Sequence, residues 1–279
     1  GALDDGSLSG ASNTAIGANS LTANTSGTLN VAIGHNALAS NTTGQQNTAI
    51  GRVALQTNIA GICNTAIGHN ALTTNICCFN TAVGNEALRL NTTGENNTAV
   101  GTSALAANTT GEKNTAVGKG SMTRNTTGKC NTGVGVDSFL FNTTGCQNTG
   151  VGNSSLAFNT TGDNNVAMGW KALNANTTAD NNTAVGMSAL TANTTGTTNT
   201  AIGNYSLYSN TEGNDNMAFG YNALGLNLTG ANNVAMGRDA LIKNTASNNT
   251  AIGHNSLKCN TSGTYNTALG TLALDANIT

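Results

Sequence analysis

The chain has 279 residues and a formal net charge of -2, and only 8% of its residues are charged. Its Lys and Arg residues are scattered singly, which excludes the basic stripe of a nucleic-acid-binding protein and a polybasic patch for anionic lipid. With 35 Gly, no Pro and 4% aromatic residues, the composition also excludes an ordinary globular core of large side chains. No apolar run is long enough to cross a bilayer, so no membrane span is predicted.

One motif, Asn-Thr-Ala-Ile-Gly, recurs with small variations about every 17 residues, in 16 copies. Such a period indicates one structural unit copied end to end. We therefore predict a single repeat domain over 1–279, with a degenerate first coil at 1–12 and an incomplete last coil at 271–279. The motif glycines are Gly17, Gly34, Gly51, Gly68, Gly84, Gly101, Gly118, Gly135, Gly152, Gly169, Gly186, Gly203, Gly220, Gly237, Gly253 and Gly270.

The first half of each repeat alternates large and small residues. A large apolar residue precedes the glycine, Ala or Gly precedes that residue, and Thr, Val or Met comes before. This period of two predicts a β-strand. We expect the large residues to face a core and a flat face of Asn, Ala and Gly to lie opposite. The expected inward row includes Ile16, Ile33, Ile50, Ile67, Val83 and Val100.

The second half of each repeat predicts another strand. The fourth residue after the glycine is Leu in 14 copies, with Met122 and Phe139 as the exceptions. Four residues further on stands Thr, Ile or Leu, as at Thr42, Ile59 and Leu228, and both positions are expected to face inward. Asn-Thr-Thr-Gly marks the turn that follows. β-Branched residues, Asn and Gly dominate without a 3.6-residue stripe, which disfavours a helix.

These patterns together predict an all-β fold, a parallel β-solenoid (β-roll) of about 16 coils of 17 residues, stacked roughly 4.8 Å apart. Two Asn positions are occupied in every copy, one from Asn13 to Asn266 and the other from Asn24 to Asn277. Stacked amides can hydrogen-bond from coil to coil, so we interpret both rows as structural.

The motif Asn-Thr-Ala-Ile-Gly-x-Asn-Ala-Leu resembles the head repeats of trimeric autotransporter adhesins and the repeat arrays of bacterial and phage fibre proteins. The resemblance covers nearly all of Asn13 to Thr279. It implies a parallel β-roll that associates as a trimer, with the flat Asn, Ala and Gly face where chains meet. This chain departs from those heads in its longer, 17-residue coil and in showing no coiled-coil stalk.

No catalytic, metal or cofactor site is predicted, so we expect no enzyme. His35, His69 and His254 each follow a motif glycine in coils that are not neighbours, and they are interpreted as solvated turn residues. Glu86, Asp137 and Asp239 share one turn position but lie three or six coils apart, which excludes a paired-carboxylate site.

The second Asn row carries the one modification signal, Asn-x-Ser/Thr, which in a secretory context could place glycan along one edge. Asn also persists where the acceptor is lost, as at Asn58 and Asn75, so a structural role stays the alternative. The candidate sites are Asn24, Asn41, Asn91, Asn108, Asn125, Asn142, Asn159, Asn176, Asn193, Asn227, Asn260 and Asn277.

Four cysteines occupy staggered positions in neighbouring coils. Cys63 directly precedes a motif Asn and Cys78 lies two residues before the next, and Cys130 and Cys146 repeat this offset. Corresponding positions about 5 Å apart could be bridged across a one-residue stagger. We predict Cys63–Cys78 and Cys130–Cys146 disulfides, with six independent thiols as the alternative; two such bonds would indicate an oxidising, extracellular compartment.

The sequence favours a structural fibre or filament subunit that is extracellular, on a cell surface or in a virion or phage fibre. Its expected partner is itself, as a head-to-tail filament or a homotrimer. The alternative is an adhesin or receptor-binding fibre segment that contacts a host-surface glycan or receptor through Trp170, Tyr205, Tyr208 and Tyr221. Ice binding is a third class, but it needs outward Thr rows, and the regular Thr rows are expected to face inward.

Overall fold

The computed structural model describes residues 10–278 and confirms the predicted all-β solenoid. The described residues form sixteen parallel three-residue strands, one per repeat, and no helix. The strands are β1 (Thr14–Ile16), β2 (Val31–Ile33), β3 (Thr48–Ile50), β4 (Thr65–Ile67), β5 (Thr81–Val83), β6 (Thr98–Val100), β7 (Thr115–Val117), β8 (Thr132–Val134), β9 (Thr149–Val151), β10 (Val166–Met168), β11 (Thr183–Val185), β12 (Thr200–Ile202), β13 (Met217–Phe219), β14 (Val234–Met236), β15 (Thr250–Ile252) and β16 (Thr267–Leu269).

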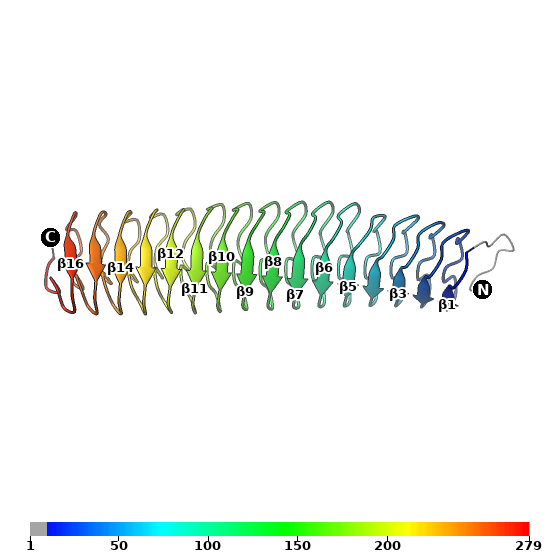
Figure 1. Cartoon of the computed structure of the whole chain (residues 1–279), viewed down its shortest axis with the longest axis horizontal. Coiled ribbons are helices and arrows are strands. Elements are labelled where there is room, and N and C mark those ends of the chain that lie inside the picture. The colour runs from blue at the N-terminus through cyan, green and yellow to red at the C-terminus, as the bar shows by residue number, and fades with distance from the viewer. Residues whose placement is uncertain (1–9, 279) are drawn as a thin grey trace. The chain divides into compact units, whose positions relative to one another are not determined.

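The chain divides into two compact units, Gly1–Thr144 with β1 to β8 and Gly145–Thr279 with β9 to β16. Within each unit the strands lie side by side in chain order (Figure 1). Equivalent residues pair with one another, as Val83 does with Val100. The same repeat builds both units, and the single domain stays a prediction. The predicted degenerate first coil, 1–12, lies largely outside the described residues.

The prediction of which strand face is inward was wrong. The middle residues Ala49 and Ala66 are fully buried, whereas Ile67 and Val100 are each 37% exposed. The middle Ala therefore faces the core, and the Thr and Ile or Val on either side of it face outward. The predicted inward row of Ile16, Ile33, Ile50, Ile67, Val83 and Val100 lies on this outer side.

The narrowness of the coil explains this orientation. At Gly133, which replaces the middle Ala of β8, an added Cβ would lie 3.0 Å from the Met122 Cε atom and 3.3 Å from the Phe139 Cδ2 atom. These two residues stand in for the usual Leu, and Phe139 is the larger. In the coil of β8, the larger residue at the Leu position thus goes with a smaller one in the strand, as expected in a closely packed core.

The second half of the repeat was predicted correctly only at its Leu row. Leu38, Leu55 and the equivalent residues from Leu21 to Leu257 are fully buried, but they lie in turns, with φ near +50°. Leu274 of the last coil is 50% exposed. Side chains alternate between two faces only where the backbone is extended. The alternation therefore does not predict the direction of the residue four positions after the Leu. Ile59 and Leu228 are exposed there, and Thr42 is half-buried.

The motif glycine is required by both its conformation and its neighbour. Its φ lies between +123° and +139° in every copy. At Gly84 an added Cβ would lie 2.5 Å from the carbonyl oxygen of Gly101 in the next coil. No other residue type fits this close approach of stacked backbones, which explains why the motif always ends in glycine.

Candidate functional site

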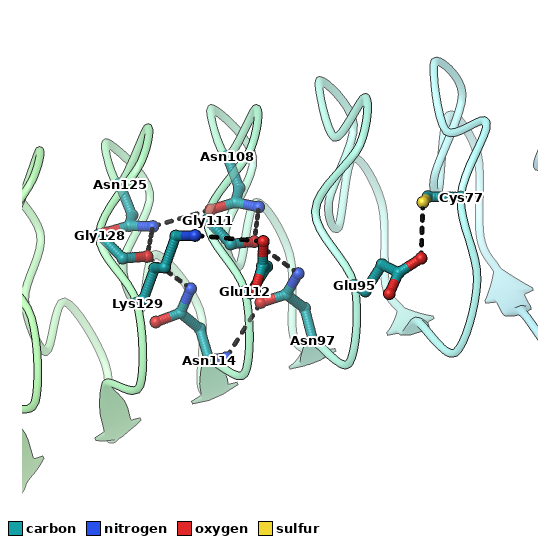
Figure 2. A network of polar contacts seen from close by, with 10 residues as sticks. All are labelled: Cys77, Glu95, Asn97, Asn108, Gly111, Glu112, Asn114, Asn125, Gly128 and Lys129. Atoms are coloured by element: carbon teal, nitrogen blue, oxygen red, sulfur yellow. Dashed lines mark hydrogen bonds and ion pairs between the residues drawn. The ribbon is translucent and has the colours of Figure 1, made fainter.

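Two ladders of buried asparagine side chains connect successive coils (Figure 2). In the first ladder, the Asn97 side-chain nitrogen donates to Asn80 Oδ1 at 3.2 Å, and Asn97 Oδ1 accepts from the backbone N–H of Asn114 at 3.0 Å. In the second, Asn108 Nδ2 donates to Asn91 Oδ1 at 2.7 Å. These carbonyls thus accept from the next coil, as the sequence predicted. Asn58 Oδ1 and Asn227 Oδ1 are exceptions, because neither accepts a hydrogen bond from the described residues.

The two ladders meet at a shared backbone acceptor. The Gly111 carbonyl accepts from Asn97 Nδ2 at 2.8 Å and from Asn108 Nδ2 at 2.9 Å (Figure 2). The same fork recurs at Gly128 with Asn114 and Asn125. Buried amides therefore satisfy one another and the turn backbone, which fixes the stacking register of neighbouring coils.

This geometry argues against glycan on the second Asn row. A glycan would be attached at the side-chain nitrogen, and that atom is buried and engaged, for example in Asn108 and Asn125. Attachment would break the ladder and open the turn. The row Asn24, Asn41, Asn91, Asn108, Asn125, Asn142, Asn159, Asn176, Asn193, Asn227 and Asn260 is buried in this way, and Asn277 donates to Asn260 Oδ1 at 3.2 Å.

The outer sheet face, defined by the first and third residues of each strand, is the most regular exposed surface. In the first unit its third-position row reads Ile50, Ile67, Val83, Val100, Val117 and Val134 in consecutive coils. Ile67 and Val117 are 37% and 36% exposed. An apolar row therefore lies on the surface, where sequence reasoning had placed a core.

Threonine occupies the first position of the same strands. From β3 to β8 the row is unbroken, and these hydroxyls make no hydrogen bond to the described residues. Turn threonines differ, because Thr92 Oγ1 and Thr109 Oγ1 each donate a hydrogen bond to a carbonyl oxygen of the next coil, at a distance of 3.0 Å. Regular Thr rows were expected to face inward, which argued against ice binding, and that expectation is wrong for the strand row.

Three of the four aromatic candidates come together in the second unit. The Tyr205 ring lies edge to face with the rings of Tyr208 and Tyr221, at centroid distances of 5.6 Å and 6.0 Å. We call these three residues the tyrosine patch. Trp170 is also exposed, but its ring contacts Lys171, whose Nζ lies 4.6 Å from the ring centroid.

The predicted disulfides are absent from the described part of the chain, where none of the six cysteines forms a disulfide. The Cys63 thiol donates to Gln46 Oε1 of the preceding coil at 3.1 Å, whereas Cys78 Sγ accepts from the backbone N–H of Ile62 at 3.3 Å. The stagger thus places Cys78 against Ile62 and turns Cys63 away from it. Cys130 and Cys146 likewise form no disulfide, so the argument for an oxidising compartment loses its support.

The Cys77 thiol has a raised pKa. Burial, and then its hydrogen bond to Glu95 Oε1 at 2.9 Å, raise its pKa to about 11 (Figure 2). The thiol stays protonated at neutral pH and is a poor nucleophile. Among residues 10–278, no group of His, Cys, Asp and Glu is arranged to hold a metal ion.

Compared with known proteins, the chain matches no family model and no curated sequence. Within the described residues, no helix is long and apolar enough to span a membrane.

Proposed function

We propose that this chain is a structural subunit of an extracellular fibre or filament. The observation that carries the proposal is the outer sheet face, which presents the same apolar row coil after coil. Eight strands about 4.8 Å apart, each three residues of about 3.3 Å, give this face an area on the order of 400 Å² in each unit. The apolar row runs along this face, and contiguous exposed apolar surface commonly marks contacts between proteins.

Association through this face is the first route to a fibre. The resemblance placed chain contacts on the Asn, Ala and Gly face, but the middle Ala row is buried inside the coil. The outer sheet face takes that role in our proposal, with a second and third copy of the chain as its occupants. Head-to-tail stacking is the second route, because every coil offers the same parallel register to its neighbour.

Lateral association predicts that charge on the outer sheet face dissolves the assembly. We expect the wild-type chain to form oligomers and the double variant Val83→Lys, Val100→Lys to be a monomer in light scattering, because apposed ammonium groups would be desolvated. The matched control is Thr93→Lys, Thr110→Lys, which adds the same charge at exposed turn positions of the same coils. A monodisperse wild-type monomer at high concentration, or equal dissociation of the control, would contradict this route.

Ice binding is a second candidate function, favoured by the outward Thr row of β3 to β8. Ice binders need a rigid, regular array of hydroxyl and methyl groups that orders water. The strand row supplies such an array, since its hydroxyls are left without partners among the described residues.

We expect a gap between freezing and melting temperatures, with faceted ice crystals, that Thr98→Lys with Thr115→Lys reduces by about half or more. Thermal hysteresis under a microscope measures it, and Thr93→Lys with Thr110→Lys is again the control. Round, unshaped crystals at high concentration of the wild-type chain would remove this candidate.

A further inference from the structure

The tyrosine patch spans neighbouring coils of the second unit. Tyr205 and Tyr208 follow β12, Tyr221 follows β13, and Arg238 follows β14. The Arg238 guanidinium carbon lies 5.5 Å from the centroid of the Tyr221 ring. Successive coils thus add aromatic and cationic groups side by side along one edge of the solenoid.

The patch is exposed and its polar tips are free. Tyr208 and Tyr221 are 41% and 48% exposed, and Tyr205 lies half-buried between them. None of the three hydroxyls bonds to a described residue. Clustered tyrosines combine apolar ring surface with a hydrogen-bonding tip at low conformational cost, which suits recognition of another molecule.

The charges beside the patch neutralise one another. Arg238 Nε lies 3.3 Å from Asp239 Oδ2, and Asn222 Nδ2 donates to Asp239 Oδ1 at 3.1 Å. The cation is therefore already paired, so the patch offers no unpaired charge to an ionic ligand. Its partner should instead be uncharged and rich in hydroxyl groups.

The shape of the surface further limits the class of molecule that the tyrosine patch can bind. No enclosed pocket exists in the described part of the chain, so a small molecule would not be surrounded. Sugar rings present a C–H face that stacks on aromatic rings and hydroxyls that pair with phenol, amide and carboxylate groups. We propose that the tyrosine patch binds a neutral oligosaccharide laid across the coils that follow β12, β13 and β14.

Binding of the full-length chain to an array of neutral and acidic oligosaccharides tests this proposal, followed by titration with the best neutral ligand. We expect Tyr208→Ala and Tyr221→Ala each to weaken affinity by about tenfold, the loss typical of one stacking contact. Tyr221→Phe keeps the ring and should lose less. The control is Tyr265→Ala, because Tyr265 is 81% exposed and lies outside the patch.

Tyr208, Tyr221 and Tyr265 are all exposed, so we expect each variant to fold. Circular dichroism of each variant checks this. No binding to neutral oligosaccharides, binding to acidic ones alone, or an equal loss in Tyr265→Ala would overturn the proposal. Light scattering on the same variants keeps the two proposals separate, because the patch residues lie outside the strands and should not alter fibre assembly.

Discussion

Replacing Ala49 with Asp is expected to destabilise its coil by about 4 kcal/mol, whereas Ile50→Asp in the same strand should cost about 1 kcal/mol or less. Ala49 is fully buried and paired between Ala32 and Ala66, so its carboxylate would have no water and no partner. Ile50 lies on the outer sheet face, where a carboxylate stays hydrated. The smaller side chain is thus the less replaceable one.

Urea unfolding followed by circular dichroism, with hydrogen exchange at the amides of β2 to β4, measures the difference. Self-association would raise apparent stability, so both substitutions belong in the Val83→Lys, Val100→Lys background, where we expect a monomer. Local exchange is needed because a repeat protein can lose one coil without unfolding as a whole. A larger loss for Ile50→Asp than for Ala49→Asp would mean that the strand faces are reversed.

Asn97→Asp is expected to cost about 3 kcal/mol, while Asn96→Asp should change stability by less than about 0.5 kcal/mol. Both changes replace an amide with a carboxylate of the same shape. Asn97 is buried, and its nitrogen faces two acceptors, Asn80 Oδ1 and the Gly111 carbonyl. A carboxylate there cannot donate and repels both. Asn96 is exposed, with a φ of 59° that Asp also tolerates.

Thermal or urea unfolding near pH 7 and near pH 4 measures this pair. The Asn97→Asp penalty should shrink at the lower pH, because burial raises the carboxyl pKa and the protonated acid can donate one hydrogen bond. The stability lost by the variant therefore appears as pH rises through that raised pKa. Equal losses of stability from the two substitutions would show that the ladder Asn contributes no more to stability than an exposed Asn does.

The sequence by itself determined the fold class, the position of the one strand that each repeat forms and the asparagine ladders. Each follows from the repeat, because stacking identical coils places Asn80 beside Asn97 and Val83 beside Val100 whatever the coil's cross-section is. The buried Leu row was also predicted from its regularity. These features depend on period and residue type, which a sequence displays directly.

Only the tertiary structure decided which strand face is the core. Size suggested Ile50, but the coil is too narrow to hold it, and the position that varies only between Ala and Gly proved to be the buried one. The positive φ at Leu55 likewise shows that the backbone is not extended there, so the alternation of faces that predicted an inward Ile59 does not apply. The thiols of Cys63 and Cys78 likewise contact different partners, because the backbone turns around them direct the two side chains differently. Side-chain direction depends on backbone turns and on the space between facing segments, and neither is visible in a list of residues.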